Sequence, residues 1–467
     1  MITKKECALK KKALFSMLPA IVTLAWPTML EQLMQTAVQY IDTAMVGSLG
    51  KQATAAVGAT STVNWLVGST VSAIGVGFLS YIAQSMGANE KDNAKKASGQ
   101  AVTAVIIVGL LFTVLTTSLS GLVPVWMQVD INIREMASRY FLILYTPMLF
   151  RTANIIFGTV LRSVGDTKSP MIVGIFVNII NILLNFFLIY PTRSVTIFDT
   201  GYTIYGAGFG IEGAAIASAV SYAFGGIAIT VRIWRHKEIS PKGQSLKPDI
   251  KILKPCLRVA LPNMFQRFAT SLGYVAFASM INSLGETSTA AHTIANTVES
   301  AFYIPGYGMQ TAAATLSGNA CGAKDKERLQ NLAKAAIPLV IVLMILSGGL
   351  LFIFAPDLML LFSKDAEVIA LGTSVLRMVA ISEPFYGVPI VIEGIMQGAG
   401  KTVSPFVFNV LGMWFVRILG TFICTQLLSY GLVSAWVCMI GHNMLLFVMF
   451  IALFASGRWK PAYMRIK

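Results

Sequence analysis

The chain is poor in charged residues. Only 12% of its 467 residues are Asp, Glu, Lys or Arg, whereas a soluble globular protein carries about 25%. Its longest polar interval, Arg235 to Lys254, is too short to build an independent hydrophobic core. Hydrophobic residues make up 55% of the sequence and recur along its whole length. The composition therefore excludes a soluble domain and predicts a polytopic membrane protein.

Histidine, cysteine and enzyme motifs are scarce as well. The three histidines lie far apart in the chain, and the five cysteines show no paired spacing, so neither a disulfide framework nor a zinc site is indicated. There is no GxxxxGK[ST] loop to hold nucleotide phosphates and no HExxH zinc motif. We therefore expect no enzyme and no cofactor, and transport that is driven by an ion gradient rather than by ATP on this chain.

Charge is unevenly placed. The net charge of +15 does not indicate a nucleic-acid partner, because the basic residues lie in short loops between apolar segments, where they set membrane topology. Their alternation predicts that both termini are cytoplasmic, in a cell (inner or plasma) membrane protein. Hydropathy predicts twelve spans. These lie near 14–46, 54–86, 97–120, 136–160, 170–191, 211–234, 253–281, 290–320, 331–355, 367–396, 404–428 and 431–455.

The two halves of the chain repeat each other at one constant offset. The offset that aligns Pro27 in LAWPTML with Pro262 in VALPNMF also aligns GDTKSP at 165–170 with GKTVSP at 400–405. The repeat predicts an all-α protein with lobes at 1–234 and 253–467, a cytoplasmic linker at 235–252, and a pseudo-two-fold axis along the membrane normal. Such a pair of lobes favours an alternating-access carrier, expected to be a monomer, over a channel.

A polar stripe runs through the first predicted span. Gln32, Gln35, Gln39 and Asp42 follow a spacing of three, four and three residues, which places them on one helix face. A carboxylate inside a bilayer costs about 2.5–3.5 kcal/mol on insertion scales. Asp42 should therefore face a cavity or polar partners, and desolvation should favour its protonated form unless a cation compensates. Two interpretations of Asp42 follow. On the first it binds a proton or cation during transport, and on the second it is a buried acid that pairs with a neighbouring residue and only joins helices.

Polar residues of the fifth and sixth spans provide possible partners. Asn181 and Asn185 lie one turn apart in VNIINILLN, and Ser218 lies in GAAIASAVS. Carboxylate, amide and hydroxyl oxygens are the ligands that a hard cation prefers. The alternative is that these side chains only join packed helices, as they often do in membranes. At the offset of the repeat Asp42 becomes Phe277, so the first half is the polar one.

Some of the other intramembrane charges are expected to form ion pairs with one another, and at least half of these charges are expected to be structural. They are Glu299, Glu383, Glu393, Arg151, Arg267, Arg377, Arg417 and Glu212. Glu31 is either a second titrating group or a partner near a helix end. With Gln35, Gln39, Tyr40 and Asn154 it completes the candidate substrate-binding set.

Several motifs together resemble the multidrug and toxic compound extrusion (MATE) family of the multidrug/oligosaccharidyl-lipid/polysaccharide exporter superfamily. They are DTAMVGSLG at the end of the first span, SMGANEKDNAKKA after the second, LRSVGDTKSP after the fourth and NIINILLN in the fifth, and the resemblance covers essentially the whole chain. It implies a V-shaped pair of six-helix lobes that exports organic cations and other amphiphiles in exchange for Na⁺ or H⁺.

The resemblance favours the DinF-like and archaeal-like branch, in which coupling lies in the N-terminal lobe. It implies that Asp42, Asn181, Asn185 and Ser218 bind the ion and that Gln35 lies beside them. That branch often has Asp where Asn185 stands here. The other branch has acids at positions that read Thr270 and Tyr386 in this chain, which argues against a C-lobe site of that type.

We therefore expect a secondary antiporter that expels amphipathic, often cationic compounds, with H⁺ or Na⁺ entering at Asp42. The alternative is a lipid-linked saccharide flippase of the same superfamily. A flippase would need a cationic cavity for pyrophosphate, for which Arg151, Arg267 and Arg417 are the candidates. A third possibility is a passive channel.

Overall fold

The protein is almost entirely helical. A computed structural model describes residues 4–127, 129–197 and 200–464. The helices are α1 (Lys4–Gly47), α2 (Lys51–Gly87), α3 (Lys91–Ser118), α4 (Val123–Trp126), α5 (Ile131–Tyr145), α6 (Met148–Ser163), α7 (Lys168–Leu188), α8 (Gly210–Trp234), α9 (Ile250–Asn282), α10 (Glu286–Phe302), α11 (Ile304–Gly322), α12 (Lys326–Phe362), α13 (Ala366–Gly398), α14 (Val403–Leu411), α15 (Leu419–Phe422) and α16 (Leu432–Ala455). Two π-helical segments, η1 (Gly412–Ile418) and η2 (Ile423–Leu427), flank α15, and a 3₁₀ turn, η3 (Ala462–Met464), follows α16.

Most of these helices are suited to a membrane. Within the described residues, eight helical segments are long and apolar enough to cross a bilayer, or nine if the bent pair α5 and α6 forms one span. The α14–η2 stretch counts as one of the eight. The helices α1 and α9 and the pair α10 and α11 complete the spans that the sequence predicts. Of these, α1 packs against α11 and α9 packs against α2, so both lie where the two halves of the chain meet.

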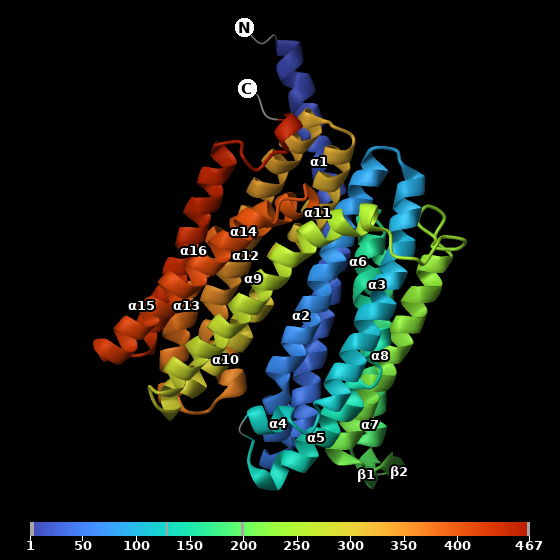
Figure 1. The fold of residues 1–467 in the computed structure, drawn as a ribbon. Helices are drawn as coiled ribbons and strands as arrows, with labels where there is room; N and C mark the ends of the chain where they lie inside the picture. The colour runs from blue at the N-terminus through green and yellow to red at the C-terminus, as the bar shows by residue number, and fades with distance from the viewer. Residues whose placement is uncertain (1–3, 128, 198–199, 465–467) are drawn as a thin grey trace.

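The two halves form two lobes. In Figure 1, α1 to α8 gather on one side and α9 to α16 on the other, and both ends of the chain lie at the same end of the molecule. The helices of the two halves come together at this end, which we call the termini end, and lie further apart at the opposite end. The predicted all-α fold of two six-span lobes is confirmed.

The repeat is visible in the backbone. Gly50 and Gly285, which the repeat aligns, both have a positive φ, of 108° and 102°. Gly165 and Gly400 form a second aligned pair, with φ of 84° and 74°. Residues with a side chain rarely adopt these conformations, so glycine fixes the same turn in each half. The two lobes therefore share their connections as well as their helices.

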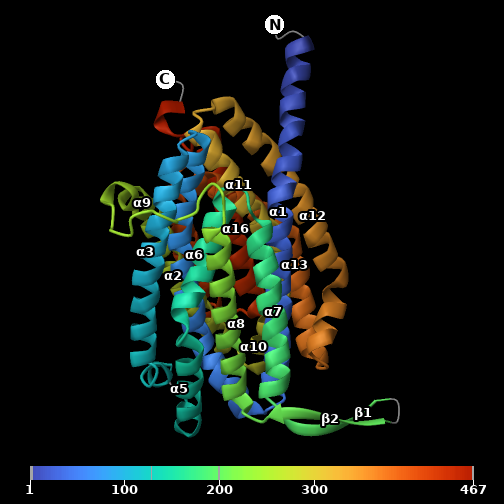
Figure 2. The same ribbon diagram turned by 90° about the vertical axis from the view of Figure 1, so that its right-hand side faces the viewer.

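Several features were not predicted. The fourth span is divided at Pro147 into α5 and α6, which meet at an angle of 51°, and the eighth is divided at Tyr303 between α10 and α11. The fifth and sixth spans are joined by an antiparallel hairpin of β1 (Pro191–Ile197) and β2 (Thr200–Ala207). Figure 2 shows this hairpin projecting from the bundle at the end opposite the termini.

Helix α1 belongs to both lobes. Near its beginning, Ile21 and Ala25 are buried in a core cluster made otherwise of C-terminal-half residues such as Met309 and Leu332. Near its end, Val46 is buried in the core of the N-terminal half. Pro19 and Pro27 lie inside α1 without ending it, as is common where neighbouring helices support the backbone in a membrane. The predicted polar stripe therefore lies on a helix that joins the lobes.

Candidate functional site

Asp42 lies at the start of a chain of polar side chains that links α1, α7 and α8. The Nδ2 atom of Asn185 donates a 2.6 Å hydrogen bond to Asp42 Oδ1. Asn185 Nδ2 is also 3.2 Å from Asn181 Oδ1, and Asn181 Nδ2 is 3.1 Å from Ser218 Oγ. The structure thus brings together all four residues that the sequence suggests for an ion site.

The Asn181 amide has a second orientation that satisfies more of its neighbours. With its oxygen and nitrogen exchanged, the nitrogen lies 2.9 and 3.1 Å from the two Asp42 oxygens, and the oxygen accepts from Ser218 Oγ at 3.1 Å. Amide orientation is assigned from such networks. In this arrangement Asp42 accepts hydrogen bonds from both asparagines. Two amide donors stabilise an ionised carboxylate without an added charge.

One acceptor in the network has no donor. Asn185 Oδ1 is buried and has no hydrogen-bond partner among the described residues. Because a buried acceptor without a partner is costly, this oxygen is suited to bind either a cation or the proton of a neutral Asp42. The five ion pairs of the described residues do not include Asp42. Its charge is therefore not cancelled by an arginine or lysine in these pairs.

The glutamines and Tyr40 of the stripe lie outside this network. Gln35 and Gln39 are exposed on α1. Tyr40 Oη instead donates to the main-chain oxygen of Thr297 at 2.8 Å, so it links α1 to α10 of the other lobe. Tyr40 also packs edge-on to Phe362, with ring centroids 6.2 Å apart.

Glu31 and Asn154, the other two candidate substrate residues, lie against other helices of the N-terminal half. Glu31 forms an ion pair with Arg162 of α6, with Nη2 2.6 and 2.8 Å from the two carboxylate oxygens. The sequence gives no sign of this pair, because its two residues are 131 positions apart and neither indicates its partner. The Asn154 side chain faces Gly225 of α8. Glu31 and Asn154 are therefore not among the side chains that surround Asp42.

The C-terminal half has a different set of buried charges. At the position equivalent to Asp42, Phe277 is buried, and Arg417 Cζ lies 4.4 Å from the centre of its ring. Glu393 accepts hydrogen bonds from Gln266 and Gln397, at 3.0 and 3.1 Å. None of the expected intramembrane ion pairs in this half is found among the described residues, although Glu299, Glu383 and Arg417 are all buried.

Arg151, in the N-terminal half, is held by neutral groups. Its Nη1 atom donates to Asn64 Oδ1 at 2.5 Å. Its guanidinium also lies over the rings of Tyr222 and Tyr145, at 4.9 and 5.9 Å from their centres. Arg151 and Arg417 therefore lie in different lobes, each among aromatic rings.

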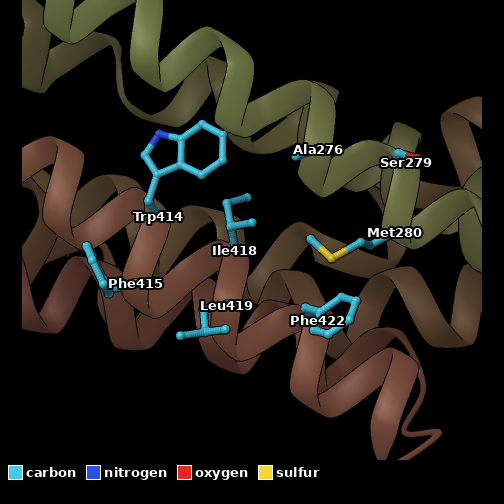
Figure 3. A pocket seen from close by; sticks show the side chains of 8 residues that line it. All are labelled: Ala276, Ser279, Met280, Trp414, Phe415, Ile418, Leu419 and Phe422. Atoms are coloured by element: carbon cyan, nitrogen blue, oxygen red, sulfur yellow. The ribbon is translucent and has the colours of Figure 1, made fainter.

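A hollow on the C-terminal half is apolar. It has a volume of about 520 Å³ and lies between α9 and the η1–α15 segment. Figure 3 shows Trp414, Ile418, Met280 and Phe422 around it. It lies on the half of the chain that does not hold Asp42.

Together, the fold and the site define a polytopic helical membrane protein of two repeated lobes, with a partly buried carboxylate bonded to buried asparagines in the first lobe. A family model described as MatE matches residues 27–187 and 262–423, two segments that begin at the aligned prolines of the repeat. The chain belongs to the MATE family.

Individual relatives agree over nearly the whole chain. A probable multidrug resistance protein NorM from Thermotoga maritima is 26% identical over 94% of this chain and 92% of its own length. The multidrug and toxin extrusion protein 1 of Danio rerio is 23% identical, over 98% of this chain and 77% of its own. A solved structure, described as the outward-facing conformation of a multidrug resistance MATE family transporter, superposes with a TM-score of 0.84 at 24% identity, covering 94% of each chain.

Proposed function

We propose that this protein is a multidrug efflux transporter that works as a secondary antiporter. It exports amphipathic, often cationic compounds across the plasma membrane and takes up H⁺ or Na⁺ in exchange. Membership of the MATE family and the names of the relatives support multidrug efflux. Exchange requires that ion and substrate weaken each other's binding, which is a reciprocal coupling.

The observation that carries the ion-coupling proposal is the Asp42 network. Asp42 accepts from Asn185, has no partner in the described ion pairs, and lies beside the unpartnered Asn185 Oδ1. When a proton binds, the neutral carboxyl group donates to a neighbouring oxygen. When Na⁺ binds, the Asp42, Asn185 and Ser218 oxygens are suitable ligands. Either ion changes how α1 is held against α7.

The substrate path lies between the lobes, next to α1. Gln35 and Gln39 are exposed on this helix, and uncharged polar groups that face lipid would be costly. We therefore assign them to a water-filled cleft that opens away from the termini end, which faces the cytoplasm. Amide groups bind substrate polar atoms there without fixing one shape, as a transporter of varied compounds requires.

The flippase alternative needs several basic residues around one cavity that binds pyrophosphate. Of the three candidate arginines, Arg151 lies in the first half and Arg267 and Arg417 in the second. Arg151 and Arg417 lie against aromatic rings, and Asp42 gives the N-lobe site the opposite charge. The arrangement thus favours cationic substrates over lipid-linked anions.

Dye efflux from proteoliposomes tests the proposal. Purified protein is reconstituted with a fluorescent organic cation inside, and Na⁺ and pH gradients are imposed separately. We expect the wild type to require one of the gradients and Asp42→Asn to lose that dependence. Asp357→Asn, an exposed aspartate on α12, is the matched control and should behave as the wild type.

Three results would contradict the proposal. Equal gradient-driven efflux by the wild type and Asp42→Asn would remove Asp42 from the coupling. Efflux that ignores both gradients would indicate a channel. Movement of a lipid-linked sugar without movement of the dye would indicate the flippase.

A further inference from the structure

The two lobes touch at the termini end through glycines that are equivalent in the repeat. Gly87 is the last residue of α2 and Gly322 the last residue of α11, and the repeat aligns the two positions. A Cβ atom on Gly87 would overlap the main-chain oxygen of Asn319 and lie 2.7 Å from its carbonyl carbon. A Cβ atom on Gly322 would overlap the oxygen of Gln84 in the same way.

These two contacts are reciprocal. Gln84 and Asn319 are also aligned by the repeat, and each lies one turn before the glycine of its own helix. The end of α2 thus makes the same contact on α11 that the end of α11 makes on α2. A self-complementary two-fold interface has this property. The equivalent residues Ala83 and Gly318 face each other between these contacts, where a Cβ on Gly318 would lie 2.6 Å from that of Ala83.

Hydroxyl groups extend the same pattern. Ser80 Oγ donates to the main-chain oxygen of Gly398 at 3.2 Å. Its repeat equivalent, Thr315 Oγ1, donates to the main-chain oxygen of Arg162 at 3.0 Å. Each bond runs from one lobe to the last turn of a helix in the other. Among the described hydrogen bonds and ring contacts, the lobes are joined nearer the opposite end only by Tyr40 and Trp65.

We propose that Gly87 and Gly322, with the Gln84 and Asn319 carbonyls that they cover, form a reciprocal backbone latch that seals the path at the termini end. This inference rests on the proposed function, because a carrier must part these helices to take up substrate from that side. Side chains larger than hydrogen prevent the closed contact but are compatible with the parted state. Adding a methyl group to either glycine therefore shifts the protein toward the parted state.

One native cysteine reports on the latch, and a second one serves as an internal reference. Cys256 and Cys321 are each 2% exposed. Cys256 of α9 is buried in the core cluster of the N-terminal half, and its main-chain oxygen packs against Gly77 of α2. Cys321 is instead buried in the core cluster of its own half. The Cys256 thiol should therefore react with a membrane-permeant maleimide only when the lobes separate at this end, whereas the Cys321 thiol should stay protected. The labelling rate at each site is measured by peptide mass spectrometry on the full-length protein in lipid nanodiscs.

We expect Gly87→Ala and Gly322→Ala each to raise labelling of Cys256 about tenfold relative to Cys321, because a methyl group against packed backbone strongly disfavours the closed state. Gly349→Ala on α12, where an added Cβ meets no atom within 4 Å, is the matched control and should label as the wild type. Ser80→Ala and Thr315→Val, which remove a bond without adding bulk, should raise labelling about threefold.

Labelling is measured without substrate or ion gradient, so a protein that fails to transport still tests the latch. The proposal is overturned if none of the four variants labels faster than Gly349→Ala. It is also overturned if only one of the two glycine variants does, because the contact is then not reciprocal. If the alanine variants do not purify as folded protein, the Ser80 and Thr315 variants decide the question.

Discussion

We predict that the hydrogen bond from Asn185 to Asp42 controls how tightly the carboxylate holds a proton. Asn185 Nδ2 lies 2.6 Å from Asp42 Oδ1, and bonds to ionised acceptors are shorter and stronger than those between neutral groups. The bond therefore stabilises the ionised carboxylate, which is the stronger acceptor, more than the neutral carboxyl. Asn185→Ala removes this donor together with the weaker neutral acceptor Oδ1, so the net effect favours the neutral form of Asp42 and the proton is released only at higher pH.

The size of the change in proton affinity follows from the strength of this hydrogen bond and from the donor that remains in Asn185→Ala. A hydrogen bond to a charged group contributes about 1.5–3 kcal/mol. The Asn181 amide, 2.9 and 3.1 Å from the Asp42 oxygens in its alternative orientation, remains as a donor. The stabilisation of the ionised form that Asn185→Ala removes should therefore lie near the lower end of this range of free energies, which corresponds to about a tenfold higher proton affinity of Asp42. The pH of half-maximal dye export should rise by about one unit.

The assay is pH-dependent dye efflux from proteoliposomes at fixed ion gradients. Asn178→Ala is the matched control, because Asn178 lies on the same helix and makes none of the described hydrogen bonds to Asp42. Its pH profile should coincide with that of the wild type. If Asn185→Ala exports dye with an unshifted profile, the bond does not control the proton on Asp42 and the reasoning is refuted.

Three further predictions concern single side chains. Asn185→Asp places a second carboxylate beside Asp42, so Na⁺ binding, measured by calorimetry, should tighten about tenfold or more, and unchanged affinity would exclude a Na⁺ site there. Glu31→Gln leaves the partly buried Arg162, whose side chain is 16% exposed, without its partner, and should lower the free energy of unfolding by about 3 kcal/mol. In denaturation experiments Glu31→Gln/Arg162→Gln should recover part of this loss, and equal losses would contradict the pairing. His236 lies after α8 in the loop, where burial lowers its pKa, so its contribution to stability is lost as pH falls below about 6.5. The melting temperature of His236→Gln should therefore vary less between about pH 8 and pH 5.5 than that of the wild type, and equal variation would contradict this.

The sequence predicts the fold because its signals are local and repeated. Apolar length marks most spans, and the constant offset between the halves marks the two lobes, which the matched segments at 27–187 and 262–423 reproduce. The residues after Tyr190, PTRSVTIFDTGYTIYGA, favour a hairpin through their Thr, Val, Ile and Tyr residues on both sides of a turn. The hairpin of β1 and β2 was missed because a hydropathy search finds only apolar spans. The break at Tyr303 and the π-helical turns of η1 and η2 depend on packing between helices, which one segment of sequence does not contain.

The grouping of side chains at the candidate ion site was predictable in part for the same reason. Asn181 and Asn185 are on one face of one helix, so their spacing predicts their proximity. The contact with Asp42 joins residues 143 positions apart, and it was inferred from polarity and family resemblance rather than from spacing. The pairing of Glu31 with Arg162 and the 3.9 Å approach of the Cys424 and Cys438 sulfurs had no sequence signal, because neither residue of a pair indicates its partner.

In the proposed antiport, helix α1 connects Asp42 to both lobes. Asp42 joins the later part of α1 to α7, while Tyr40, two residues earlier and so on a different face, donates to Thr297 of the other lobe. Nearer the termini, Ile21 and Ala25 of the same helix are buried in the C-terminal core. A change in the charge of Asp42 alters the first of these attachments and leaves the others, so the proposal expects α1 to shift relative to α7 while it stays attached to the C-terminal half. The proposed ion site thus acts on the lobe interface through α1 itself, and the proposal requires no titrating carboxylate in the C-terminal lobe.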